Sequence, residues 1–252
     1  MEMVLLTALG VGGATVLGAL IGFLFKNVSA KFTDVVLSFA AGVMLAAAVV
    51  GLILPSVEEG GDNAVLLTIA GVFCGAIALN IVDRIVPHMH KVFGGNKEEK
   101  HPQLNSRINK VMLFVLAIAI HNLPEGIAAG VGFGSGDNVG ALITAGGIAL
   151  QNFPEGMVII APMLSLGIGK KRAFLIAAAT GIVEVVGTLI GYFAVSLSAM
   201  ILPFALSFAG GTMLYIISDE MIPETHSNGY ERAATYALLV GFCLMLAIDF
   251  YL

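Results

Sequence analysis

The segment VMLFVLAIAIHNLPEGIAAGVGF, residues 111–133, carries polar side chains in the middle of a run long enough to cross a membrane. About 20 apolar residues in a helix span the ~30 Å hydrocarbon core of a bilayer. Seven further runs of this kind lie on either side of it, at residues 4–25, 34–56, 64–86, 139–165, 173–195, 200–221 and 232–251. The sequence therefore predicts an all-α polytopic membrane protein with eight transmembrane helices, in one transmembrane domain over residues 1–252.

The composition supports this class and excludes others. Of the 252 residues, 58% are hydrophobic and 12% are charged, whereas roughly a quarter of the residues in a soluble domain are charged. The 31 glycines fit a membrane protein, because glycine lets transmembrane helices approach closely. The net charge of −5 excludes a basic nucleic-acid-binding protein, so no nucleic-acid partner is expected.

The distribution of basic residues predicts the orientation in the membrane. All 12 Lys and Arg residues fall in connections on one side of the predicted spans, and cytoplasmic connections of membrane proteins collect these residues. We therefore expect an integral protein of the cell membrane with both termini outside and a cytoplasmic loop at about residues 87–109.

The opposite, outer side carries acidic residues and no basic ones, among them Glu58 and Asp249. Such a surface raises the local concentration of cations, so these two residues are candidates for the point where a cation enters. Ordinary solvation is the simpler explanation for any one of them.

Two copies of one motif occur 30 residues apart, HNLPEG at residues 121–126 and QNFPEG at residues 151–156. They are identical at four of six positions and lie in consecutive predicted spans. Those spans run in opposite directions, and at ~1.5 Å per residue each motif begins roughly 15–18 Å from the start of its helix. Both motifs are therefore expected near the middle of the membrane.

Each motif places a polar side chain and a carboxylate on one helical face, His121 over Glu125 and Gln151 over Glu155. An imidazole nitrogen and carboxylate oxygens can reach a common divalent cation from such positions. Glu184 is a third carboxylate at comparable depth.

Three unpaired charges at that depth cost on the order of 8–10 kcal/mol, so protonation, a water-filled cavity or a bound cation must offset them. A divalent cation answers the charge count best because it neutralises two carboxylates at once. A proton pathway is the alternative.

With these paired motifs and eight spans, the sequence resembles the ZIP (Zrt/Irt-like) metal transporters, and within them the GufA-like branch. The resemblance covers essentially the whole chain and implies a homodimer with a 3+2+3 inverted-repeat arrangement of helices. It also implies a transport site made of motif residues, a glutamate of the sixth span and a methionine of the second span. These residues are His121, Asn122, Glu125, Gln151, Asn152, Glu155, Glu184 and Met44.

Two positions depart from the family pattern. Many ZIP proteins have histidine where this chain has Gln151, and some have aspartate where it has Asn152. Glutamine and asparagine offer only neutral carbonyl oxygens. We therefore expect one well-bound ion and at most a weaker neighbouring one.

The substrate expected from these ligands is Zn2+, with Cd2+, Fe2+ or Mn2+ as alternatives. Imidazole suits such ions better than Mg2+, and so does the thioether that the resemblance implies at Met44. From the residues alone, Met44 is interpreted as core packing.

The sequence contains no ATP-binding motif, so transport is expected to follow gradients into the cytoplasm. The resemblance implies elevator-type alternating access, and a selective channel with the same ligands is the alternative. No enzyme is expected, because the protease signature HExxH is absent, and no cofactor is expected.

Five residues on the cytoplasmic side are candidates for an exit site, and family members commonly carry histidines in this loop. They are Asp83, His88, His90, Glu224 and His226. Solvation of a loop is the competing interpretation of the histidines. For the neighbouring Asp219 and Glu220, solvation of a helix end is the preferred interpretation.

Overall fold

The computed structural model of this chain describes residues 1–25, 28–93, 102–134, 136–197 and 199–251. Within its helices, the side chains of residues 83, 85–93, 102–110, 113–114 and 199 are outside the description. The described residues form helices and connecting turns, with no strand.

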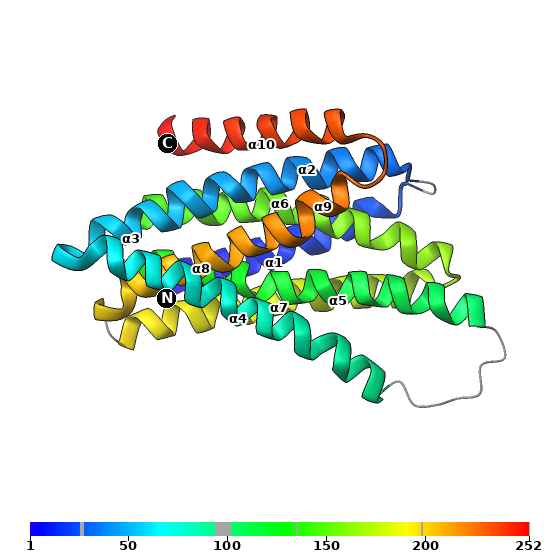
Figure 1. Cartoon of the computed structure of the whole chain (residues 1–252), viewed down its shortest axis with the longest axis horizontal. Helices are drawn as coiled ribbons and strands as arrows, with labels where there is room; N and C mark the ends of the chain where they lie inside the picture. The colour runs from blue at the N-terminus through cyan, green and yellow to red at the C-terminus, as the bar shows by residue number, and fades with distance from the viewer. Residues whose placement is uncertain (26–27, 94–101, 135, 198, 252) are drawn as a thin grey trace.

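Long helices that lie lengthwise side by side make up the bundle (Figure 1). In chain order they are α1 (Glu2–Gly22), α2 (Ala30–Ala46), α3 (Leu54–Glu59), α4 (Ala64–Phe93), α5 (Pro102–Val131), α6 (Asn138–Ser165), α7 (Lys170–Leu197), α8 (Leu202–Ile216), α9 (Ile222–Thr225) and α10 (Glu231–Tyr251). Two π-helical segments, η1 (Ala47–Ile53) and η5 (Ile217–Met221), make α2–α3 and α8–α9 continuous rods.

Local sequence explains several of the helix starts. The hydroxyl of Ser29 accepts a hydrogen bond from the backbone N–H of Phe32 and caps α2. The carboxylate of Asp137 accepts from Val139 and Gly140, both at 3.1 Å, and caps α6. Asp137 is therefore explained by helix capping.

Seven helical stretches among the described residues are long and apolar enough to cross a membrane. They are Glu2–Gly22, Ala30–Glu59, Gly61–Val82, Val115–Gly134, Lys170–Leu197, Leu202–Thr225 and Glu231–Tyr251. The remaining predicted span, residues 139–165, corresponds to α6. Its 28 residues include three polar side chains close together, Gln151, Asn152 and Glu155. The prediction of a helical polytopic membrane protein is confirmed.

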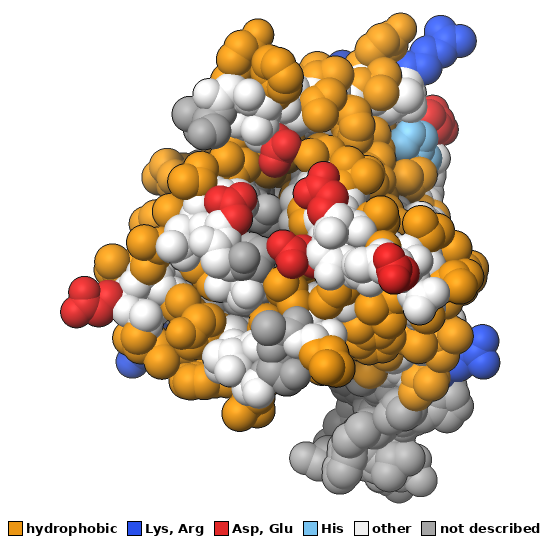
Figure 2. Space-filling view, turned by 90° about the vertical axis from the view of Figure 1, so that its left-hand side faces the viewer, with side chains coloured by type: hydrophobic (Ala, Val, Ile, Leu, Met, Phe, Trp, Pro, Cys, Tyr) orange, Lys and Arg blue, Asp and Glu red, His pale blue; other side chains and the backbone are white. Residues whose placement is uncertain are grey.

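Both termini lie at one end of the bundle, which we call the termini end (Figure 1). Seen from that side, Asp and Glu side chains gather on its face, and Lys and Arg side chains show only at the edges (Figure 2). The opposite end holds the turn before Lys170 and the connection that leads to Arg232, and we call it the basic end.

The long helices sort into two groups by their contacts. The first block consists of α1, α5, α6 and α7, where α1 packs along α6 and α7, and α5 packs along α7. The second block consists of α2–α3, α4, α8–α9 and α10, where α2 packs along α10 and α4 along α8. The two blocks meet mainly where α2 contacts α6 and where α5 contacts α8.

These contacts occur in matched pairs. The α1–α6 contact corresponds to α7–α5, the α2–α10 contact to α8–α4, and the α2–α6 contact to α8–α5. In each pair, the first member involves one of the first helices of the chain and the second involves its counterpart among the last. The π-helical segments, one in each of the rods α2–α3 and α8–α9, follow the same correspondence.

Glycines bring the backbones together inside each block. In the first block, a Cβ at Gly18 would stand 2.0 Å from the carbonyl oxygen of Phe153. In the second block, a Cβ at Gly42 would stand 1.9 Å from the carbonyl oxygen of Leu238. Such approaches leave no room for any side chain, so they hold paired helices at a fixed register.

Glycines at the boundary between the blocks face side chains instead. A Cβ at Gly51 would meet Thr144 Oγ1 at 2.4 Å, and one at Gly147 would meet Met245 Sδ at 2.6 Å. Side chains can change rotamer, whereas a backbone carbonyl in a helix cannot move independently. These two contacts can therefore adjust more readily than the backbone approaches at Gly18 and Gly42.

Candidate metal site

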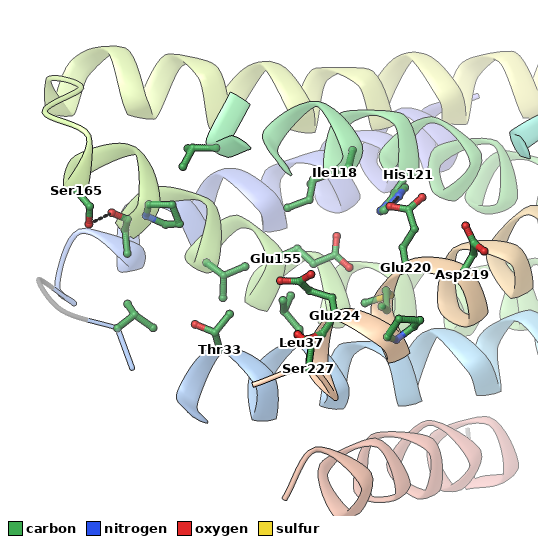
Figure 3. A pocket seen from close by; sticks show the side chains of 18 residues that line it. Thr33, Leu37, Ile118, His121, Glu155, Ser165, Asp219, Glu220, Glu224 and Ser227 are labelled. Carbon is green, nitrogen blue, oxygen red and sulfur yellow. Dashed lines mark hydrogen bonds and ion pairs between the residues drawn. The ribbon is translucent and has the colours of Figure 1, made fainter. Parts of the chain in front are cut away.

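A cavity of about 980 Å³ leads from the basic end into the middle of the bundle. Its outer part is lined by Ser165 and Ser227, and its inner part by His121 and Glu155 (Figure 3). Helices α5 and α6 of the first block form one side, and α2 with the η5–α9 segment of the second block forms the other.

His121 and Glu155 are the motif residues that line this cavity. Both are buried, with 7% and 5% of their surfaces exposed, so an ion reaching them would lose most of its water. The two side chains are near enough to interact electrostatically. They offer one imidazole nitrogen and one carboxylate to whatever occupies the cavity.

Glu220 of η5 stands beside them, with its Oε2 atom 2.8 Å from Nε2 of His121. The expectation that Glu220 merely solvates a helix end was wrong, because its side chain lines the cavity and points to the site (Figure 3). The π-helical turn of η5 shifts the register of the helix, and nothing in the sequence pattern marked that turn.

Glu125 lies deeper, with no exposed surface, and is held by the second motif. The amide nitrogen of Gln151 donates a hydrogen bond of 2.8 Å to its Oε1 atom. The other oxygen, Oε2, is buried and has no partner in the structure. One lone-pair-bearing oxygen of Glu125 is thus free for an ion.

Glu184 of α7 is also fully buried, and both of its oxygens are engaged. Thr15 of α1 donates to Oε1 at 2.7 Å, and the amide nitrogen of Asn122 donates to the same atom. The amide nitrogen of Asn152 donates to Oε2 at 2.6 Å. Three different helices therefore donate to this one carboxylate.

The amides are oriented by these carboxylates, because a turned amide would bring its oxygen against a negative charge. Their own oxygens are left unsatisfied. The buried acceptors without a partner here are Asn122 Oδ1, Glu125 Oε2, Gln151 Oε1 and Asn152 Oδ1. Buried acceptors without donors are costly, and a cation is the kind of group that satisfies several of them together.

The described side chains include no three His, Cys, Asp or Glu residues already arranged around one point. The reason is visible in the hydrogen bonds: Glu125 and Glu184 are turned to amides, while Glu155 faces the cavity. A cation arriving through the cavity would meet His121 and Glu155 first, and would recruit Glu125 through its free oxygen.

The sequence profile of the ZIP zinc transporter family matches residues 94–249 of this chain. The chain is 39% identical to the zinc transporter GufA of Myxococcus xanthus over 251 residues, which covers 97% of both chains. The chain belongs to the ZIP zinc transporter family. It is therefore a transporter and an integral membrane protein, and not an enzyme.

Two other relatives place this ZIP protein more broadly. It is 39% identical to the zinc transporter ZIPB of Bordetella bronchiseptica over 249 residues, covering 94% of this chain and 77% of the relative. It is 30% identical to the human zinc transporter ZIP11 over 319 aligned positions, covering 94% of this chain and 93% of the relative.

Other predicted residues of this ZIP protein lie apart from the motifs. Met44 is fully buried in the apolar core and is not among the residues that line the cavity. Glu224 lines the outer part of the cavity (Figure 3). The ring of His226 hydrogen-bonds the carbonyl of Ile222 at 2.9 Å and the hydroxyl of Thr235 at 3.1 Å, and so links α9 to α10.

The remaining candidates are at the two ends of this ZIP protein. Glu58 is exposed at the termini end, and Asp249 is half-buried near the end of α10. The side chains of Asp83, His88 and His90 lie outside the described residues.

Proposed function

We propose that this ZIP protein is a secondary transporter that moves Zn2+ into the cytoplasm through a site between α5, α6 and α7. The observation that carries the proposal is that His121 and Glu155 line a cavity in a membrane-spanning bundle, with unpartnered buried acceptor oxygens on other residues of the same motifs. Such a group binds cations and repels anions.

The charge balance supports a divalent ion. Glu125, Glu155 and Glu184 are near enough to repel one another. No Lys or Arg occurs in residues 111–133, 139–165 or 173–195, which surround them. A cation is therefore the group that makes three carboxylates tolerable in a bilayer.

The ligand set favours Zn2+ over Mg2+, because imidazole nitrogen suits zinc and cadmium while magnesium prefers an all-oxygen shell. The relatives that match most of this chain are named zinc transporters, which agrees with this choice. Cd2+, Fe2+ and Mn2+ are further candidates for the same ligands.

The charges of the loops support an orientation of the protein in the membrane. Basic residues gather at one end of the bundle, and on this basis we infer that this end is cytoplasmic and that both termini lie outside the cell membrane. The cavity opens toward the basic end, so this conformation faces the cytoplasm. On the other side of the motifs, Ala128, Val131 and Ile148 belong to one apolar core cluster, which we propose closes the outer path.

The mechanism proposed is alternating access, in which the first block slides past the second and carries the site with it. Backbone contacts through glycine hold each block together, and side-chain contacts separate the blocks. The matched helix contacts support the 3+2+3 inverted repeat that such a mechanism uses, with α5 and α6 between two related sets of three.

The route through the protein is proposed from the acidic side chains along it. Glu58 and Asp249 attract the ion at the termini end, and His121, Glu125 and Glu155 bind it in the middle. Glu220 and Glu224 line the way out. We propose that Asp83, His88 and His90 lie beyond them, where the ion enters the cytoplasm. His226 is a further candidate residue of this exit site.

The second block supplies the surface for a homodimer. Its outer helices α4 and α10 are the least buried of the candidate spans, and each packs mainly along a single neighbour. A second copy bound there would hold the second block still while the first block moves.

A selective channel would use the same ligands, and kinetics separates the two. A carrier saturates at low ion concentration and turns over slowly, whereas a channel conducts many ions during each opening. The side-chain boundary between two internally rigid blocks favours the carrier.

Uptake of 65Zn2+ into proteoliposomes tests the proposed function. We expect saturable uptake that Cd2+ competes more strongly than Mg2+, and that His121→Ala and Glu155→Ala each abolish. Glu59→Gln, which neutralises an exposed glutamate at the termini end, is the matched control and should transport normally. Uptake that survives both alanine substitutions would overturn the proposal.

A further inference from the structure

Glu155 and Glu184 are both buried carboxylates of the site, but their surroundings differ. Glu155 faces the cavity beside His121. Glu184 accepts hydrogen bonds from Thr15, Asn122 and Asn152, so N–H and O–H donors occupy three of its roughly four lone-pair sites. Donors placed around a carboxylate repel a cation.

The net charge of the site also limits the number of cations that can bind. The three buried glutamates supply three negative charges, so one divalent cation leaves a charge of −1 and two would leave +1. Asn152 lies next to Glu184 and, being neutral, adds nothing to this negative charge. A residual −1 on Glu184 is already stabilised by its donors, whereas a residual +1 has no buried anion to balance it.

Thr15 reaches Glu184 because α1 is pressed against α6. A Cβ at Gly156 would stand 2.0 Å from the carbonyl oxygen of Thr15, so the backbones touch directly beside Glu155. This contact places the Thr15 hydroxyl on Oε1 of Glu184, where Thr15 has 1% of its surface exposed.

Resting on the proposed function, we propose that this transporter carries one divalent cation per cycle, and that Thr15, Asn122 and Asn152 hold Glu184 as a hydrogen-bonded anchor instead of an ion ligand. Thr15, Asn122 and Asn152 are then positioning residues, and the two asparagines, which add no charge, determine the number of ions. His121, Glu125 and Glu155 are the side chains that contact the ion.

The number of bound ions tests the inference. Zn2+ bound to the detergent-solubilised full chain is measured by equilibrium dialysis and elemental analysis, at saturating concentration. The same protein carrying His121→Ala and Glu155→Ala is measured in parallel, and its bound zinc is subtracted so that loop histidines do not count. We expect one Zn2+ per chain in the native sequence.

Two substitutions that add charge are expected to create a second site. Asn152→Asp and, independently, Asn122→Asp each place a carboxylate against Glu184, and the count should rise from one to two. The native chain holding two ions, or both aspartate variants holding one, would overturn the inference.

Thr15 is tested by Zn2+ affinity at a constant count of one. Thr15→Val removes a donor to Glu184 with little change in shape and should weaken Zn2+ binding by about 10-fold, the lower end of the range for outer partners of a metal site, because Thr15 acts on the ligands only through Glu184. Thr15→Ser keeps a hydroxyl and should bind Zn2+ with the native affinity. Native affinity in folded Thr15→Val would contradict a positioning role.

The inference and the proposed function fail differently. If His121→Ala with Glu155→Ala leaves both bound zinc and 65Zn2+ uptake unchanged, the proposed function is wrong. If the two substitutions remove two ions from a chain that transports zinc, only the one-ion inference is wrong.

Discussion

The two blocks are packed in the same way, through close contacts at glycines, but the interior of the first is polar and that of the second is mainly apolar. At the centre of the first block lie buried amides and carboxylates, among them Glu125, Asn152 and Glu184. At the centre of the second lie apolar side chains such as Met44 and Met213. This difference supports the proposal that the first block binds the ion and that the second block forms an apolar surface along which the first can move.

Near its centre the second block has buried hydroxyls, such as that of Thr212 beside Met213, and its described charged groups lie farther out. Its buried carboxylate among the described residues, Asp34, lies near the start of α2 and accepts a hydrogen bond of 2.9 Å from Asn228. Glu220 is the residue of this block that reaches the ion site. It therefore lies at the contact between the two blocks, beside the proposed ion site.

The largest effect is expected inside the first block. Glu155→Gln removes a ligand, and we expect Zn2+ affinity to fall by more than about 100-fold. Glu184→Gln leaves the three proposed ligands in place, so it should lower Zn2+ affinity by less than Glu155→Gln does. Equal losses, measured as dissociation constants by calorimetry, would erase the distinction between the two glutamates.

Acidification should act on the first block's ligands. Zn2+ binds neutral imidazole and ionised carboxylates, so protons compete with it and binding weakens as pH falls. The apparent KM for uptake should rise on going from pH 7.5 to pH 6, by up to about tenfold per pH unit for each proton displaced. A KM that stays constant while uptake still requires His121 would contradict direct ligation.

Glycine-to-alanine changes should show how tightly the helices inside each block are packed. Gly18→Ala and Gly42→Ala force a methyl against a backbone carbonyl and should each lower stability by about 1–3 kcal/mol. Gly146→Ala, which has nothing within 4 Å of the added methyl, is the control. Thermal unfolding in detergent measures all three, and loss of stability in the control alone would refute the packing argument.

The smallest effect is expected from the second block's contact with the site. Glu220 is 27% exposed, and a partly exposed ion pair contributes about 0.2–1 kcal/mol, so Glu220→Gln should change KM by less than about fivefold. Asp219→Asn removes the neighbouring charge in the same cavity and serves as its control. Complete loss of uptake in Glu220→Gln would make it a ligand equal to Glu155.

Much of this arrangement could be predicted from the sequence because membrane helices leave strong signals. The apolar runs gave the helical class, and the repeated motif pointed to His121 and Glu155, which the structure brings to one cavity. The spacing of the motifs predicted their common depth, since helix rise is constant.

Other features depend on tertiary contacts that a single sequence does not contain. Glu220 reaches His121 through a π-helical turn. The saturation of Glu184 requires Thr15, which lies 169 positions away in the chain. The sequence also does not tell which glycines join helices within a block and which face the boundary, because this is determined by how the helices pack.

The most direct test of the central claim is to fasten the two blocks together. Cysteines at Gly51 and Thr144 would join them, because a Cβ at residue 51 lies 3.3 Å from the Cβ of Thr144, close to disulfide spacing. Cysteines at Gly132 and Ala141, with a Cβ separation of 3.4 Å, form the matched bridge inside the first block. Cys74 and Cys243 are replaced by serine in both.

Uptake of 65Zn2+ is then measured before and after oxidation. If the first block moves against the second, the bridge between the blocks stops uptake and a reductant restores it, while the bridge inside the first block leaves uptake unchanged. Undiminished uptake through a fully oxidised Gly51→Cys/Thr144→Cys protein would contradict the movement of one block past the other.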